Sequence, residues 1–164
     1  YDRQRVEQCL LQARKEHDMS MIKACEDALH FFSDQEYFIL HRKDKGGKTR
    51  LAPIIGPYKE SVIHRMKNTT PDALVWNYVN SNCDVHGYRA DYATYLYKLY
   101  ARPIELLDYK KKILCADGKL RSEIYVCRSD EKGKKLDRKA IRAVSVALGH
   151  NREDTAITSY IRNL

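Results

Sequence analysis

The chain has 164 residues, of which 43% are hydrophobic, so it is long enough to bury a core of its own. Its formal net charge of +8 favours a polyanionic partner, nucleic acid among them. Five scattered cysteines without a C-x-x-C pair give no basis for a disulfide framework or a zinc site, and they favour a reducing cytosol. The sequence shows no apolar run of membrane-spanning length and no secretory signal.

The N-terminal half predicts helices around one β-hairpin. Apolar residues at Val6, Leu10, Leu11 and Ala13 recur among charges at helical spacing. In chain order we expect a helix over residues 2–17, a helix over 19–31, strands over 37–40 and 50–55 joined by the glycine turn 44–48, a helix over 58–67, and a helix from Pro71 through Asn80.

The C-terminal half predicts three more helices and a second hairpin. In order, these are a helix over 87–100, a hairpin over 113–127 turning at Asp117-Gly118, a charged loop over 129–135, a helix from Asp137 to Leu148 stopped by Gly149, and a short helix capped by Asn151 that carries Tyr160. The sequence shows no βαβ alternation. The expected fold class is therefore mainly α with small β-hairpins (α+β), in a single domain over 1–164.

Four local patterns carry possible chemistry. His86 and Arg89, at i and i+3, would point to one side of a helix, where an arginine fork matches phosphate oxygens. A lysine on the Gly46-Gly47 turn, His150 after the glycine stop, and Tyr160 could add a proton donor, a second phosphate ligand and a nucleophile. Taken singly, each pattern also fits a capping histidine, a solvated charge or a core tyrosine.

Together these patterns resemble the catalytic domain of the tyrosine recombinase (phage integrase) family. The hairpin over 45–54, His86-Gly87-Tyr88-Arg89, Leu148-Gly149-His150 and Tyr160 match, in order, the family's lysine hairpin, H-x-x-R box, L-G-H box and nucleophile. The resemblance runs from about residue 37 to the C-terminus. The sequence is also similar to integrases of conjugative elements and prophages, which are comparably lengthened between the two histidine motifs.

The resemblance implies a site-specific recombinase that cleaves and rejoins DNA through a 3′-phosphotyrosyl intermediate. Tyr160 would attack the phosphate, Lys45 would protonate the leaving oxygen, Arg89 and His150 would bind the non-bridging oxygens, and His86 would assist proton movement. Lys48, Arg50 and Arg152 would contact DNA. The implied partner is double-stranded DNA at a specific recombination site, bound by a homotetramer. No metal, other cofactor or membrane is expected, and the localisation would be the bacterial cytoplasm, at the nucleoid.

Three departures from the family pattern stand out. The first catalytic arginine, expected in a G-L-R-x-x-E box before the hairpin, is not evident, and Lys23 stands at that spacing before Glu26. Residues 100–135 look like an insertion. The chain starts at Tyr1, so we expect a fragment that lacks the family's N-terminal core-binding domain.

Rival interpretations remain open at this stage. A catalytically impaired DNA-binding domain of the same family would explain the missing arginine and the positive charge. A type IB topoisomerase uses similar chemistry on one duplex. A basic interaction domain without a nucleic-acid role would require the four motifs to be coincidental.

Overall fold

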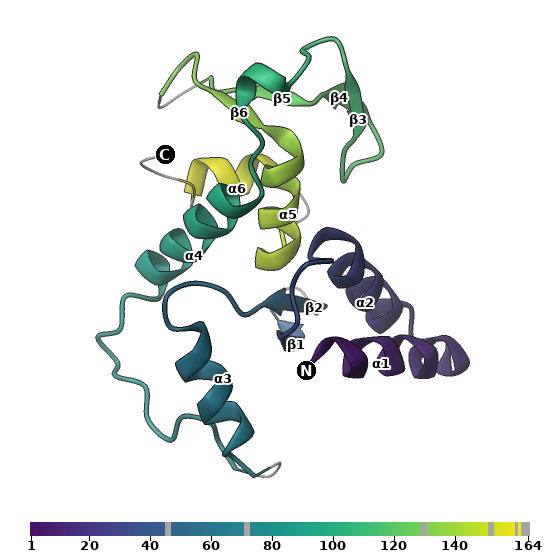
Figure 1. Cartoon of the computed structure of the whole chain (residues 1–164), viewed down its shortest axis with the longest axis vertical. Coiled ribbons are helices and arrows are strands. Elements are labelled where there is room, and N and C mark those ends of the chain that lie inside the picture. The colour runs from purple at the N-terminus through teal and green to yellow at the C-terminus, as the bar shows by residue number, and fades with distance from the viewer. Residues whose placement is uncertain (45–46, 71–72, 129–130, 151–152, 160, 162–164) are drawn as a thin grey trace. The chain divides into compact units, whose positions relative to one another are not determined.

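The computed structural model describes residues 1–44, 47–70, 73–128, 131–150, 153–159 and 161. The fold is mixed, with helices and small antiparallel β-hairpins, as expected for the α+β class. By its internal contacts the chain divides into two compact units, Tyr1–Tyr88 and Arg89–Leu164 (Figure 1). In the described part of the chain, no helix has the length and apolar character needed to cross a membrane.

The first unit opens with two helices, α1 (Arg3–Glu16) and α2 (Met19–Phe31), which confirm the predicted ranges. Each begins at an aspartate whose carboxylate accepts a backbone N–H of the first turn. The Asp2 carboxylate accepts from Arg5 N at 2.8 Å, and that of Asp18 from Met21 N at 3.0 Å.

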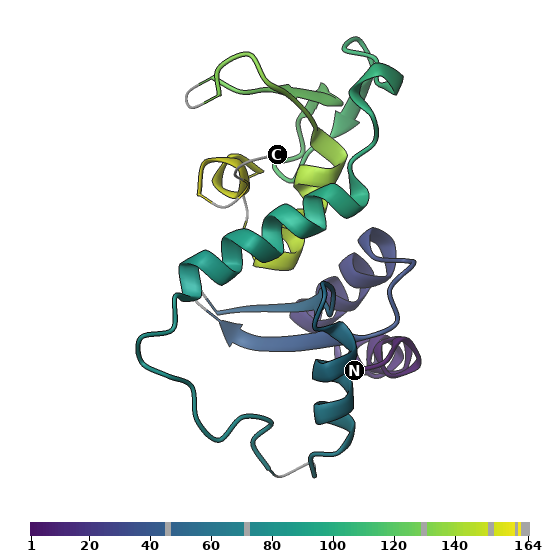
Figure 2. The ribbon, with the colours of Figure 1, turned by 60° about the vertical axis from the view of Figure 1, so that its left-hand side comes forward.

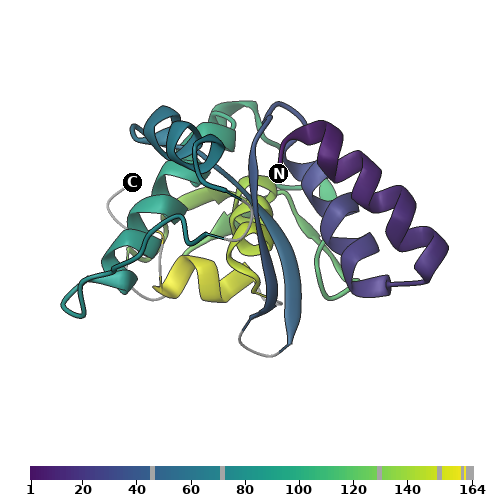
Figure 3. The same ribbon diagram turned by 90° about the horizontal axis from the view of Figure 1, so that it is seen from below.

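The hairpin of the first unit packs against α2. Its strands, β1 (Phe38–Asp44) and β2 (Lys48–Pro53), are antiparallel, with Leu40 opposite Leu51. Figure 3 shows both strands running beside α1 and α2. The shared core comprises Val6, Ala13, Met21, Ala24, Cys25, Ala28, Phe32, Phe38, Leu51 and Ala52.

The third helix, α3 (Lys59–Lys67), confirms the helix predicted near 58–67, but the helix predicted from Pro71 through Asn80 is wrong. Residues 73–84 form bends and turns. The Asn80 side chain accepts the backbone N–H of Asn82 at 2.9 Å, and its carbonyl accepts that of Cys83 at 3.0 Å. Such local bonds compete with helical ones, and the segment offers few strong helix formers.

Helix α4 (Val85–Tyr100) begins in the first unit and continues into the second. The 3₁₀ turn η1 (Ile104–Leu106) follows it. Two hairpins come next, β3 (Lys112–Leu114) with β4 (Leu120–Ser122), then β5 (Ile124–Val126) with β6 (Lys135–Asp137). The unit closes with α5 (Arg138–Leu148) and α6 (Glu153–Ser159) (Figure 2).

The single hairpin predicted over 113–127 is therefore wrong in extent. The turn at Asp117-Gly118 is correct, but residues 124–126 pair onward with β6. Of the charged loop predicted over 129–135, residues 131–134 lie between β5 and β6, whereas Lys135 already belongs to β6. We call residues 101–137, which contain both hairpins, the insert.

The core of the second unit is built around α5. One face of this helix is buried through Ala140, Ile141, Val144, Ala147 and Leu148, as expected for an amphipathic helix. Buried side chains from α4, the insert and α6 complete the core: Ala93, Leu96, Tyr97, Ile124, Leu136 and Ala156.

Candidate active site

The H-x-x-R box lies in the first turns of α4. The Asp84 carboxylate accepts the backbone N–H of Gly87 at 2.8 Å and so caps this helix. A Cβ atom added at Gly87 would lie 2.8 Å from Asp84 Cγ, so any larger residue would displace the capping carboxylate. His86 is exposed and Arg89 is half-buried, one turn apart on the same helix.

The L-G-H box is the C-terminal cap of α5. Gly149 has a φ of 75°, the left-handed conformation that glycine adopts without steric cost. The N–H of His150 bonds to Ser145 O at 2.8 Å, and that of Gly149 to Val146 O at 3.1 Å, which is the Schellman arrangement. Leu148 is buried, and the His150 Nε2 atom is inaccessible to solvent. The motif therefore ends the helix and fixes the position of the His150 backbone.

Arg89, the last residue of the H-x-x-R box, contacts the L-G-H box inside the second unit. An Nη atom of Arg89 donates a hydrogen bond to the carbonyl oxygen of Leu148 at 3.2 Å, across 59 positions of sequence. This carbonyl is one of the last four of α5, which have no partner within the helix, and a cation is favoured at this end of the helix dipole. The contact fixes the Arg89 guanidinium beside the turn that presents His150.

Tyr160 lies outside the described residues, but the chain on either side of it is well anchored. Helix α6 ends at Ser159, immediately before it. Ile161, immediately after it, is buried and donates its N–H to Ala156 O at 2.9 Å, and Ala156 is itself fully buried.

Of the residues expected to contact DNA, Lys48 and Arg50 are described by the structure and Arg152 is not. Also outside the described residues are Lys45, the expected proton donor, and Asn151, the expected cap of the last helix. Lys48 is half-buried at the start of β2, whereas Arg50 on the same strand is only 9% exposed. Contact between Arg50 and DNA would therefore require its side chain to leave the protein interior.

Lys23 lies on the exposed side of α2. Its ammonium group is 2.7 Å from Asp27 Oδ2, in an i, i+4 pair, and its side chain is 75% exposed. Such surface pairs contribute roughly 0–1 kcal/mol, so the pair would release the lysine readily.

A buried ionic network in the second unit was not predicted from the sequence. Both carboxylate oxygens of Asp137 accept hydrogen bonds from the Arg102 guanidinium, at 2.8 and 2.9 Å, and Glu123 Oε2 accepts a third at 3.2 Å. Burial opposes ionisation of Asp137, but the bonds from Arg102 outweigh it, and the pKa of this carboxyl is below its ordinary value. The backbone N–H of Asp108 is the main cause that lowers the pKa of Glu123.

A second buried pair links α5 with α6. Arg138 Nη1 lies 3.3 Å from Glu153 Oε2, and the two residues are 9% and 7% exposed. Charged residues are expected at the surface by default, so neither pair could be recognised without the fold.

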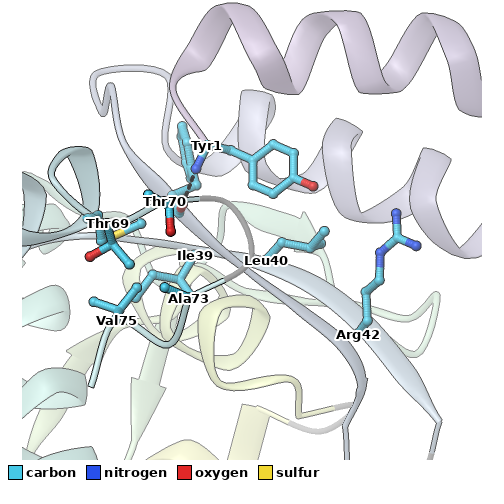
Figure 4. A pocket seen from close by; sticks show the side chains of 10 residues that line it. Tyr1, Ile39, Leu40, Arg42, Thr69, Thr70, Ala73 and Val75 are labelled. Atoms are coloured by element: carbon cyan, nitrogen blue, oxygen red, sulfur yellow. Dashed lines mark hydrogen bonds between the residues drawn. The ribbon is translucent and has the colours of Figure 1, made fainter. Parts of the chain in front are cut away.

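The first unit also contains a groove of about 650 Å³ between β1 and the chain that follows α3 (Figure 4). Ile39, Leu40, Thr69, Ala73 and Val75 line it, with Arg42 at one end. The groove includes none of the residues that the sequence singled out.

No protein-family model, no curated protein and no solved structure matches the chain.

Proposed function

We propose that this chain is the catalytic domain of a tyrosine-type site-specific DNA recombinase. The observation that supports this most directly is the hydrogen bond from Arg89 to Leu148 O, at 3.2 Å. The proposal requires that the H-x-x-R and L-G-H boxes share one phosphate site. Unrelated surface motifs would have no reason to meet across so long a stretch of sequence.

The local geometry suits the roles proposed for these residues. A guanidinium oriented by a carbonyl at a helix end presents a planar set of donors, which suits the oxygens of a phosphodiester. His150, held by the cap of α5, would be the second ligand, and its Nε2 atom, which is inaccessible to solvent, would have to turn outward to reach a phosphate. Together they would stabilise the charge that develops on the phosphate during attack.

In the proposed reaction the Tyr160 oxygen attacks the scissile phosphorus, and the 5′-oxygen leaves with a proton from Lys45. His86 accepts or relays the tyrosine proton. The 3′-phosphotyrosyl bond keeps the energy of the phosphodiester, so a 5′-hydroxyl of a partner strand can reverse the step without ATP. In a tetramer on two recombination sites, this exchange joins new strands.

The test is formation of a covalent adduct with a nicked suicide substrate that carries the recombination site. Wild type should form the adduct, and Tyr160→Phe should form none while retaining affinity for DNA, because the ring remains and only the attacking oxygen is lost. Tyr78→Phe, the same change at a 76% exposed position, is the matched control and should behave as wild type.

An adduct that persists in Tyr160→Phe would place the nucleophile elsewhere. DNA binding by wild type without any adduct would instead favour the catalytically impaired DNA-binding domain. Relaxation of one supercoiled duplex, with no exchange between two sites, would favour the topoisomerase.

A further inference from the structure

The carboxylate of Glu153 is held from two directions. Glu153 is the first residue of α6, and one of its oxygens accepts from Arg138 Nη1 at 3.3 Å. The other accepts from the backbone N–H of Ala116, in the β3–β4 turn of the insert, at 3.4 Å. Helix α6 is therefore tied both to α5 and to the insert.

Arg138, the partner of Glu153, also makes three contacts with the insert. Its Nε donates to Ser122 O at 2.6 Å, its backbone N–H donates to Glu123 O at 2.8 Å, and its guanidinium lies 5.1 Å from the ring centre of Tyr125. The cation therefore cannot follow α6 if that helix shifts. Movement of Glu153 would leave two buried charges unmatched, which is strongly unfavourable.

Helix α6 needs such support because of its length. It has seven residues, and a helix this short is not stable by itself, so its position depends on contacts with the rest of the unit. Among its described side chains, Glu153 and Ala156 are the buried ones, and Glu153 makes the directional contacts.

We infer that the insert is a support for α6, acting through Arg138 and Glu153, and that these two are positioning residues for the nucleophile at position 160. The positioning role rests on the proposed function, whereas the support of α6 does not. The role fits the chain's departure from the family pattern, because the added hairpins supply Ser122, Tyr125 and the Ala116 N–H.

The test compares Glu153→Gln with Glu131→Gln. The first keeps the size of the side chain and removes the buried charge. The second makes the same chemical change in an exposed pair, Glu131 with Lys134, that has no described contact with α6. Amide hydrogen exchange is measured without DNA, and single-turnover adduct formation and duplex affinity are measured at a temperature where all variants are folded.

In Glu153→Gln we expect the α6 amides to exchange at least about tenfold faster, with the amides of α5 and α2 unchanged. Adduct formation should slow by up to about 10²-fold, because small misplacements of a reacting group have such effects, while DNA affinity stays unchanged. Glu131→Gln should match wild type in each measurement. Arg138→Lys, which keeps the charge and loses the fork, should lie between wild type and Glu153→Gln.

Unchanged exchange in α6 would overturn the support role, and an equal loss of affinity and rate would overturn the positioning role. If Glu153→Gln does not fold, the exchange profile of Arg138→Lys decides the question by the same criteria. Absence of an adduct from wild type would contradict the proposed function alone, since the exchange measurement would still show whether Glu153 holds α6.

Discussion

At the scale of single residues, several motif positions have structural duties of their own. Gly87 leaves room for the Asp84 cap, Gly149 adopts a left-handed turn, and Arg89 binds the end of α5. These duties explain why glycine and arginine suit those positions. They also mean that a substitution there changes local structure together with any chemistry, so variants need controls that separate the two.

Lys23 offers a gain-of-function test. If it stands where the family has its first arginine, Lys23→Arg should raise the adduct rate by roughly tenfold, because a guanidinium can form two charge-assisted hydrogen bonds to the phosphate. Lys15→Arg, the same change at an exposed position of α1, is the control and should have no effect. An unchanged rate in folded Lys23→Arg would show that Lys23 is not at the phosphate.

At the scale of elements, capped and amphipathic helices were predictable and the segment 73–84 was not. The range of α2 was predicted residue for residue, and α5 was bounded correctly by Asp137 and Gly149. Pro71 was a start signal without apolar periodicity behind it, and Asn80 instead begins a turn. Strand 124–126 was assigned to the wrong hairpin because three-residue strands carry too little pattern to choose a partner.

Substitution of the glycine that caps α5 tests whether its turn serves activity as well as stability. Gly149→Ala should lower the free energy of unfolding by about 1 kcal/mol, the cost of a left-handed alanine, and should also reduce adduct formation because His150 follows directly. Gly118→Ala is a matched control, because Gly118 has nearly the same φ, 76°, in the β3–β4 turn. Chemical denaturation should give similar losses of stability for both. Equal adduct rates would show that the turn at Gly149 does not position the site.

At the scale of the whole molecule, charge acts in two ways, through the buried network and through the net excess of cations. The meeting of the two boxes was implied by the family resemblance, but the contact between them was not predictable. Nor were the partners of Asp137 and Glu153, because buried ionic contacts between distant segments leave no periodic trace in a sequence. Tyr160 and Lys45 stay predictions.

The network predicts how stability depends on pH. Asp137→Asn should lower the free energy of unfolding at neutral pH by about 3 kcal/mol, since it removes the fully buried charge that accepts two bonds from the Arg102 guanidinium and leaves Glu123 as the acidic partner of Arg102. The folded-state pKa of Asp137 is lowered, so its stabilisation is complete above the ordinary carboxyl pKa of about 4 and is lost as pH falls below it. Denaturation at several pH values should therefore show the gap between wild type and variant closing in acid. The control Asp91→Asn, at an exposed position of α4, should change stability by less than about 0.5 kcal/mol.

The net charge of +8 predicts salt-sensitive binding to duplex DNA. The logarithm of affinity should fall linearly with the logarithm of salt concentration, with a slope of about −0.9 per neutralised phosphate. Fluorescence anisotropy of a labelled duplex would measure the slope. A duplex with uncharged methylphosphonate linkages is the control and should show little dependence. A flat response with ordinary DNA would contradict an electrostatic interface.

The position of Trp76 determines what the intrinsic fluorescence of this protein can report. It is the single tryptophan of the sequence, its side chain is 46% exposed, and the Arg65 guanidinium lies 5.8 Å from its ring centre. An indole already in contact with water has little further spectral shift to undergo when the chain unfolds. The adjacent cation would also draw an anionic quencher such as iodide towards the ring. Tryptophan emission is therefore a probe of the segment between α3 and α4, while the cores of the two units are spectroscopically silent at that wavelength.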